Sequence, residues 1–202
     1  MFITFEGLDF CGKSTQVKLL EKYLLAENKQ VLLIREPGGT AISEKVRDVL
    51  LDRKNSEMFL ETELILFSAS RAQLVREKII PHLEKGYYII SDRFHDSSIA
   101  YQGFGRNIDL DFVEHLQMFA IKNTLPDITF FIDIPIKEVL KRKAKLKAAE
   151  LDRIEISKND FYEKVREGYL YLAGKEKRFK RIDGLLTIEE IHNIIIEEIS
   201  KQ

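Results

Sequence analysis

A glycine-rich segment near the start of the chain limits the possible folds more than any other feature. Gly7 to Ser14 reads G-L-D-F-C-G-K-S, which has the spacing G-x-x-x-x-G-K-S. The apolar run Met1 to Phe5 precedes it and predicts a buried strand, and Thr15 to Asn28 follows with the apolar spacing of an amphipathic helix. A strand, a glycine-rich loop and a helix in this order indicate a parallel α/β fold.

The glycine-rich loop has the properties of an anion site. Backbone N–H groups of a loop that opens a helix point toward a bound anion, and the helix dipole favours negative charge there. We therefore expect the loop to hold the phosphates of a nucleotide. Lys13 would reach the outer phosphates, and the Ser14 hydroxyl would bind Mg²⁺.

The rest of the chain alternates between apolar runs and helical patterns. Further strands are predicted at Val31–Ile34, Tyr87–Ile90, Ile128–Ile132 and Phe179–Ile182. Helices are predicted at Ser43–Leu51, Glu61–Glu84, Asp109–Asn123, Ile136–Lys147 and Asp160–Ala173, with a last one opened by the capping box Thr187–Glu190. This order predicts a three-layer α/β/α fold with a five-stranded parallel sheet. Ligands are expected beyond the carboxyl ends of its strands.

Composition sets further limits on the protein. The 202 residues suit one domain, 1–202, and a formal net charge of -1 gives no electrostatic reason to expect nucleic acid or a membrane as a partner. The one cysteine, Cys11, excludes an intrachain disulfide and a cysteine-rich metal site. Met1 leads directly into the first predicted strand, and no apolar run could span a bilayer. We therefore expect a cytoplasmic protein.

Chemically active side chains follow the predicted strands and lie on one predicted helix. Asp92 follows the run Tyr87–Ile90, the position of an acidic residue that organises Mg²⁺ in enzymes with this loop. Arg93 next to it carries a planar set of donors that suits phosphate. Phe67 and Arg71 are four residues apart, so they share a helix face and could stack on a base and bond its edge.

Taken together, these segments resemble the thymidylate kinase family, bacterial type, over nearly the whole chain. Glu6-Gly7-Leu8-Asp9 resembles the start of the family's loop, and residues 35–40, Arg-Glu-Pro-Gly-Gly-Thr, resemble a segment of bacterial members. Asp92 to Gln102 resembles the signature D-R-[FYH]-x-x-S-[ST]-x-A-Y-Q, the most specific of the matches. Pro126-Asp127, Asp133 and Leu151 to Glu155 resemble the fourth-strand pattern and the end of the bacterial lid.

The resemblance implies a reaction, a cofactor and an assembly. The γ-phosphoryl group of ATP would pass to dTMP, giving dTDP and ADP in dTTP biosynthesis, with Mg²⁺ as cofactor. Members of the family are homodimers, so a homodimer is implied as well. The residues that would bind ATP are Gly7, Leu8, Asp9, Phe10, Cys11, Gly12, Lys13, Ser14 and Thr15.

The resemblance also implies three groups of residues that bind dTMP. Those that would contact the sugar or the phosphate are Asp9 on the sugar, Glu36 near the phosphate and metal, and Arg47 and Arg93 on the phosphate. Those that would contact the base are Phe67 by stacking, Arg71 through a thymine carbonyl, and Ser98 and Gln102 at the base edge. Tyr101 would disfavour a ribose 2′-hydroxyl by crowding.

Phosphoryl transfer depends mainly on alignment and charge neutralisation, so cations and metal ligands are the expected catalytic groups. A lid at approximately 141–155 would close over the transferring group and exclude water. The implied catalytic residues are Lys13, Asp92, Arg93 and the lid cations Arg142 and Arg153, with Lys147 as a weaker lid candidate, and the implied metal ligands are Ser14 and Asp92.

The loop departs from the family at Phe10-Cys11, where relatives usually carry Gly-Ala or Gly-Ser. If the backbone has a positive φ at this position, Phe10 is expected to cost roughly 1 kcal/mol or more.

Three other functions fit parts of the sequence. Another small kinase of the same group would keep the loop and the Asp92-Arg93 pair but change the base pocket. A GTP-binding switch needs Asn-Lys-x-Asp, and residues 28–31, Asn-Lys-Gln-Val, lack the final Asp. A non-catalytic nucleotide-binding module would be expected to lose Lys13, Asp92 or Arg93, and all three are present.

Overall fold

A five-stranded parallel sheet forms the centre of the computed structural model, which describes residues 1–145, 151–156 and 159–201. Its strand order is β2-β3-β1-β4-β5, and each neighbouring pair runs parallel. The strands are β1 (Phe2–Glu6), β2 (Val31–Arg35), β3 (Tyr88–Asp92), β4 (Ile128–Asp133) and β5 (Phe179–Asp183). The predicted five-stranded parallel sheet is therefore confirmed.

The burial of the strands follows their apolar content. Every residue of β1 and β4 is buried, whereas the edge strands β2 and β5 expose part of theirs. Strands covered by helices on both faces need side chains that are apolar on both sides, which the near-continuous runs supply. Phe5 packs against Phe130 of the neighbouring strand with ring centroids 5.4 Å apart.

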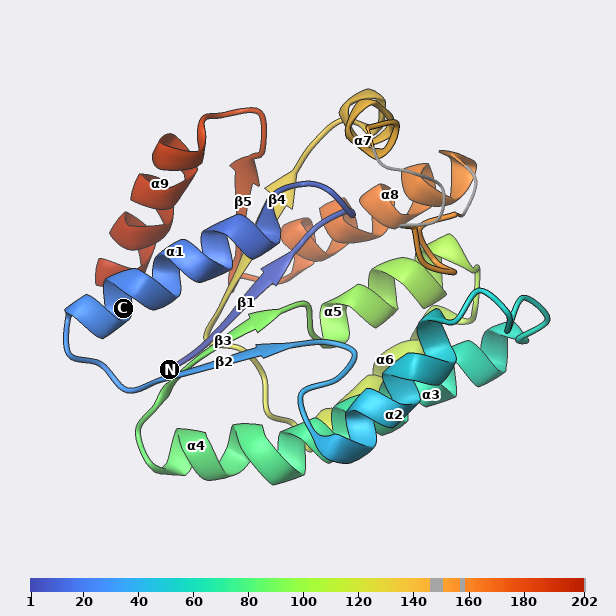
Figure 1. Cartoon of the computed structure of the whole chain (residues 1–202), viewed down its shortest axis with the longest axis horizontal. Helices are drawn as coiled ribbons and strands as arrows, with labels where there is room; N and C mark the ends of the chain where they lie inside the picture. Colours follow the sequence, from blue (N-terminus) through green and yellow to red (C-terminus); the bar gives the residue numbers. More distant parts are fainter. Residues whose placement is uncertain (146–150, 157–158, 202) are drawn as a thin grey trace.

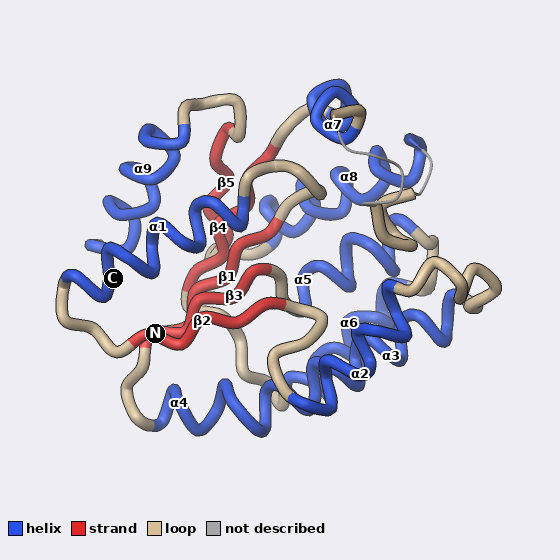
Figure 2. Tube along the Cα trace, in the orientation of Figure 1, coloured by secondary structure: helices blue, strands red, loops and turns tan. Residues whose placement is uncertain are grey.

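Helices cover both faces of the sheet (Figures 1 and 2). One face carries α1 (Lys13–Ala26) and α9 (Ile188–Ser200), which pack against each other. The other helices are α2 (Ala41–Leu51), α3 (Leu60–Leu74), the π-helical turn η1 (Val75–Ile79), α4 (Ile80–Glu84), α5 (His95–Ser98), the π-helical segment η2 (Ile99–Gly105), α6 (Leu110–Ile121), α7 (Ile136–Lys143) and α8 (Asn159–Lys175). In the described part of the chain, no helix is both long enough and apolar enough to cross a membrane.

The helices differ from their predicted ranges in two informative places. The predicted helix Glu61–Glu84 is helical throughout, but it is divided into α3, η1 and α4. Helix α5 and segment η2 were not predicted, because their polar residues are buried: all four residues of His95–Ser98 are buried, so no amphipathic pattern marks them. Part of the predicted lid at 141–155, including Lys147, lies outside the described residues.

The strand register brings the polar strand ends together. Asp92 lies opposite both Phe5 of β1 and Arg35 of β2. Glu6, the last residue of β1, lies opposite Phe131 of β4. The loop after β1 therefore begins beside the segment that follows Asp92, at the sheet edge where ligands bind in folds of this kind.

Candidate active site

The loop after β1 takes its shape from residues with positive φ. Gly7 and Gly12 have φ of 137° and 104°, a region that favours glycine. A Cβ on Gly7 would lie 2.5 Å from the carbonyl oxygen of Ile132, so a larger residue does not fit there. Phe10 has φ of 65°, so the strain predicted for a positive φ at this position is present in the loop.

Lys13 and Ser14, the first two residues of α1, have different polar contacts. The Lys13 ammonium donates to the carbonyl oxygens of Gly7 at 3.1 Å and Leu8 at 2.8 Å, so the side chain lies over the loop. The Ser14 hydroxyl donates to Asp92 Oδ2 at 2.6 Å. The start of α1 and the end of β3 thus bring the two predicted metal ligands together.

The Ser14–Asp92 pair fits Mg²⁺ in its chemistry. Mg²⁺ prefers oxygen ligands, keeps several waters and is commonly held by one or two protein groups together with substrate phosphates. The described residues contain no cluster of three or more His, Cys, Asp or Glu side chains that could hold a metal. A hydroxyl and a carboxylate beside a phosphate-binding loop are therefore what a Mg²⁺–nucleotide complex needs, whereas a metal held by protein alone would need more ligands.

A cavity of about 470 Å³ opens beside the loop. Its volume is in the range that holds a small-molecule ligand. All nine residues predicted to bind dTMP line it: Asp9, Glu36, Arg47, Phe67, Arg71, Arg93, Ser98, Tyr101 and Gln102. The loop residues Phe10, Gly12, Lys13, Ser14 and Thr15 and the carboxylate Asp92 line it too. The structure therefore brings residues from six segments of the chain to one place.

Arg93 dominates the end of the cavity nearest the loop. It follows β3 with φ of 71°, a rare conformation for a residue with a side chain. Its guanidinium donates to Asp9 Oδ1 at 2.5 Å, to the Tyr101 hydroxyl at 3.0 Å and to the Gly7 carbonyl at 3.0 Å. The Tyr101 hydroxyl in turn donates to Asp9 Oδ2 at 3.1 Å. We call this part of the cavity the phosphate end.

Two further arginines border the phosphate end. Arg35 and Arg47 both donate to the Pro37 carbonyl, at 3.0 and 2.8 Å, and Arg35 also pairs with Glu44. Burial and the neighbouring Arg35 lower the pKa of Arg47 from its ordinary value, although an arginine remains a cation. Together with Arg93 they supply positive charge suited to an anionic ligand.

Arg71 lines a second part of the cavity, which we call the base end. It is 1% exposed and pairs with Glu36, with Nε 2.7 Å and Nη2 2.6 Å from Oε2. Its remaining donors reach the Ser98 hydroxyl at 2.9 Å, the Phe94 carbonyl at 3.1 Å and the Gln117 side chain. Burial raises the pKa of Glu36 in spite of the attraction of Arg71.

The other residues of the base end lie on neighbouring helical segments. Phe67, one turn before Arg71 on α3, is half-buried and lines the cavity. Gln102 on η2 donates through Nε2 to Glu63 Oε1 at 3.0 Å. An aromatic ring, a guanidinium and an amide at one end of a cavity can stack on a planar base and bond its edge.

The two predicted lid cations do not line the cavity. Arg142 on α7 donates to the Phe10 carbonyl at 2.9 Å, so it touches the nucleotide loop, and it pairs with Glu138. Arg153 is buried, donates to the Leu50 carbonyl at 2.8 Å and pairs with Glu63 at 2.8 Å. The arrangement brings Arg142 to the loop but holds Arg153 in a protein ion pair.

Three carboxylates at or beside the site were given no role from the sequence. Asp152 and Glu155 line the cavity, and burial raises the pKa of both. Glu6, at the end of β1, is fully buried. The position of Glu6 directly before Gly7 could have indicated a role for it in the site. A charged residue at a strand end is equally typical of the protein surface, however.

Comparison with known proteins gives a consistent result. The family model for thymidylate kinase matches residues 5–195. A thymidylate kinase of Thermosipho melanesiensis is 52% identical over 195 residues, 96% of this chain and 95% of the relative. One of Chlorobaculum tepidum is 45% identical over 207 residues, covering 98% and 96% of the two chains.

A solved structure agrees with the sequence relatives. The crystal structure of thymidylate kinase from Ehrlichia chaffeensis has a TM-score of 0.78 and 36% sequence identity to this chain, and the match covers 98% of each chain. Near-complete coverage at this identity means that the two chains share one fold over their whole length. The chain belongs to the thymidylate kinase family.

Proposed function

We propose that the loop and the cavity together transfer the γ-phosphoryl group of ATP to dTMP, giving dTDP and ADP in dTTP biosynthesis. As a member of its family, the chain is a dTMP kinase. The observation that carries the assignment of the site is the convergence of all nine predicted dTMP residues on a single cavity beside the loop. Other small kinases of this group would share the loop but not this base end.

The chain's residues act mainly by alignment. Lys13 and the loop from Gly7 to Thr15 would hold the phosphates of ATP. The contacts of Lys13 with two loop carbonyls keep its ammonium beside the loop. Ser14 and Asp92 would hold Mg²⁺, which neutralises charge on the donor phosphates when it is bound. Arg93 borders the same space and would bind the acceptor phosphate.

The acceptor would lie along the cavity with its phosphate toward Arg93 and its base toward Arg71. Arg47 adds charge for the phosphate, and Glu36 lies nearby. Asp9 would bond the sugar, with Tyr101 against the position of a 2′-hydroxyl. Support comes from the Tyr101–Asp9 hydrogen bond of 3.1 Å, which fixes the phenol at the wall of the cavity.

The base would be read by side chains that the fold holds in place. Phe67 would stack on thymine, and Arg71, Ser98 and Gln102 would face its edge. The hydrogen bond between Arg71 and Ser98 supports this proposal, because it fixes the two edge-reading groups relative to each other.

For the lid we propose Arg142 as the first cation to reach the transferring group. Its contact with the Phe10 carbonyl already brings it to the nucleotide loop. Arg153 would have to leave Glu63 and Leu50 before it could act, so its catalytic role requires a rearrangement of residues 151–156. The proposed division of the chain remains one domain with a lid at approximately 141–155.

We propose a homodimer and a cytoplasmic location as well. Exposed apolar side chains on two adjoining helices support the dimer: Ile65 of α3 and Phe112 and Phe119 of α6 are 56%, 54% and 74% exposed. The cytoplasm is where ATP and nucleotide precursors meet. Sedimentation of the chain, alone and with Phe119→Asp, tests the dimer.

The function is tested by ADP formation from ATP and Mg²⁺ with a panel of nucleoside monophosphates. We expect strong turnover with dTMP, weaker turnover with dUMP and little with dCMP or dGMP. Turnover with only a different monophosphate would contradict the base end but keep the phosphate chemistry. Equal rates with all four would contradict base reading, and no turnover with any of them would contradict the proposed reaction.

A further inference from the structure

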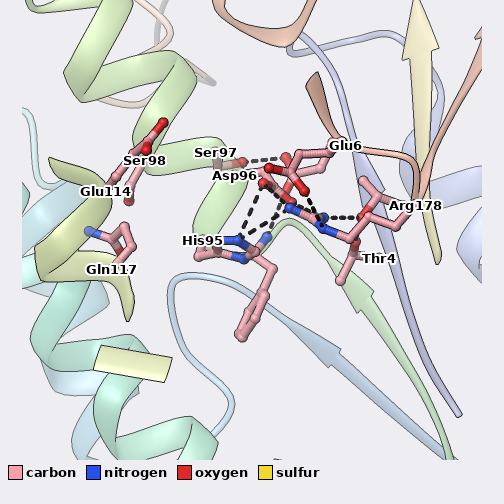
Figure 3. A network of polar contacts seen from close by, with 12 residues as sticks. Thr4, Glu6, His95, Asp96, Ser97, Ser98, Glu114, Gln117 and Arg178 are labelled. Atoms are coloured by element: carbon pink, nitrogen blue, oxygen red, sulfur yellow. Dashed lines mark hydrogen bonds and ion pairs between the residues drawn. The ribbon is translucent and has the colours of Figure 1, made fainter. Parts of the chain in front are cut away.

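A buried carboxylate, Glu6, lies at the end of β1, directly before the loop. Figure 3 shows Glu6 beside Asp96 and Ser97 of helix α5, with Arg178 close by. Glu6 is 0% exposed and accepts three hydrogen bonds: from the Phe94 backbone N–H at 2.7 Å on Oε1, and from the hydroxyls of Ser97 at 2.6 Å and Tyr169 at 2.8 Å on Oε2. All of its close partners are therefore donors, as an ionised carboxylate requires.

The two hydroxyls that donate to Glu6 also contact Arg93. Arg93 Nη1 lies 3.2 Å from Ser97 Oγ and 3.1 Å from the Tyr169 hydroxyl oxygen. A hydroxyl has a single proton to give. While that proton points to Glu6, the lone pairs of the oxygen are free to accept from Arg93. The two hydroxyls also lie 3.0 Å from each other, and when both donate to Glu6 the order runs from guanidinium to hydroxyl to carboxylate.

We propose that Glu6, through Ser97 and Tyr169, is a positioning residue that holds Arg93 in its phosphate-binding orientation, and that this holding requires the ionised form of Glu6. The inference rests on the proposed role of Arg93 toward the dTMP phosphate. Glu6 touches neither substrate nor the loop's metal ligands. Glu6 therefore affects the reaction only by positioning the guanidinium of Arg93.

Protonation of Glu6 would rearrange these hydrogen bonds. Oε1 already accepts the Phe94 N–H, so an added proton belongs on Oε2. That proton would be donated to one of the two hydroxyls, Ser97 or Tyr169. The two hydroxyl oxygens lie 3.0 Å apart, so that hydroxyl would turn its own proton from Glu6 to the other hydroxyl. Arg93 would then donate to acceptors with no negative charge behind them, and its hydrogen bonds would weaken.

The charges around Glu6 bring this change into the physiological range. Burial and the negative charge of Asp96 on α5 raise the pKa of Glu6, Arg93 and the hydrogen bonds of Ser97 and Tyr169 oppose the rise, and the resulting pKa is about 7. Arg178, which precedes β5, pairs with Asp96 at 2.7 Å and also interacts electrostatically with Glu6. Glu6 is therefore mostly ionised at pH 8 and mostly protonated at pH 6.

The test compares kcat/KM for dTMP between the wild-type chain and Glu6→Gln from pH 6 to pH 9. Glutamine resembles the protonated side chain in shape and charge. The ratio of wild type to variant at each pH cancels the ionisation of dTMP itself, because both proteins use the same substrate. We expect a ratio of about ten at pH 8.5, falling toward one at pH 6. A ratio that stays constant across this range would overturn the proposal.

A double-variant comparison separates positioning from a general loss of structure. If Glu6 acts through Arg93, Glu6→Gln should change kcat/KM by less than about twofold when Arg93 is already alanine. The same tenfold loss in both backgrounds would overturn the proposal. Ser97→Ala and Tyr169→Phe interrupt the same path without altering the buried charge, so they test it even if Glu6→Gln folds poorly. Each should lower kcat/KM, and full activity in both would overturn the path.

Thr4→Val serves as the matched control. Thr4 lies two residues before Glu6 on β1, so its side chain is on the same face, and it is equally buried. Its hydroxyl bonds Thr129 at 2.8 Å rather than any partner of Arg93. We expect its pH profile to follow that of the wild type. Lack of dTMP turnover by the wild-type chain would overturn the proposed function, whereas an active wild type with an unaffected Glu6→Gln would overturn only the role of Glu6.

Discussion

The two ends of the cavity use arginine in opposite ways. At the base end, Arg71 sits in the regular helix α3, is 1% exposed and has hydrogen-bond acceptors on all three guanidinium nitrogens. At the phosphate end, Arg93 has φ of 71°, follows a strand, and keeps 16% of its side chain exposed beside Asp9.

This difference gives the two arginines different roles. Arg71 belongs to a wall of the cavity that is already assembled, which we call the preassembled wall, whereas Arg93 is a group that can bind a ligand. A fully paired buried arginine is part of the structure, and its removal leaves its partner charge uncompensated. An arginine at a cavity edge in an uncommon backbone conformation is strained, and strained residues of this kind cluster at ligand-binding sites. We therefore expect a loss of stability when Arg71 is removed and a loss of turnover when Arg93 is removed.

The largest effect is expected from Arg93→Ala, which removes the cation of the phosphate end. Single arginines that stabilise transferring phosphoryl groups contribute about 10³–10⁵ in rate, so kcat/KM for dTMP should fall by that order. Loss of the pair with Asp9 should itself cost little unfolding free energy, because Asp9 is partly open to solvent. Steady-state kinetics and a denaturant titration measure the two quantities.

Arg93→Lys is the control for charge. Lysine keeps the cation but lacks the planar fork, so we expect it to recover only part of the lost activity. Near-normal turnover by the alanine variant would remove Arg93 from the reaction and break the contrast between the two ends.

The next effect in size is expected from Arg71→Met at the base end. Methionine suits a helix and fills much of the volume, but Glu36 would remain buried without its partner. Breaking a buried pair in this way costs about 3–5 kcal/mol of unfolding free energy. Chemical denaturation at pH 8 measures it.

Replacing Glu36 as well tests whether its unpaired charge causes the loss of stability. Arg71→Met with Glu36→Gln leaves no uncompensated charge and should recover much of the lost stability, though not dTMP turnover. A loss below about 1 kcal/mol in the single variant would show that Arg71 is not structural, and the two ends would then be alike.

A smaller change in stability is expected from the pH dependence of Glu6. The pKa of Glu6 is raised from 4.5 to about 7, so the folded chain binds this proton more tightly than the unfolded chain. The resulting stabilisation is present in full below pH 4.5 and is lost as pH rises through about 7. From pH 5.5 to 8.5, the wild type should lose about 2 kcal/mol relative to Glu6→Gln. Equal slopes of stability against pH would contradict the raised pKa.

The phosphate end could be predicted from sequence because its parts are contiguous. Seven residues from Gly7 to Lys13 form the loop by local geometry, and Asp92-Arg93 directly follows a strong strand pattern. The parallel sheet then brings the two together by its register alone. Strand periodicity and one motif are enough for this part of the molecule.

The base end could not be derived in the same way. Phe67 and Arg71 share a helix face, but the contacts of α3 with Ser98 and Gln102 depend on how it packs against α5 and the π-helical segment η2, which have no periodic signal. Only the resemblance linked them. Glu6 was missed for a related reason, since its burial depends on Tyr169, which is far away in sequence.

The smallest effect is expected from Phe67→Ala, which removes the ring proposed to stack on the base. Base–aromatic stacking is worth about 1–3 kcal/mol, so KM for dTMP should rise about tenfold while kcat changes little. Stacking does not read the base edge, so KM for dUMP should rise by the same factor, and Phe67→Tyr should retain most of the affinity because it keeps the ring. Stability should hardly change, since Phe67 is only half-buried. Unequal effects on the two substrates would mean that Phe67 contacts the thymine methyl group, and a large loss of stability would make this ring part of the preassembled wall together with Arg71.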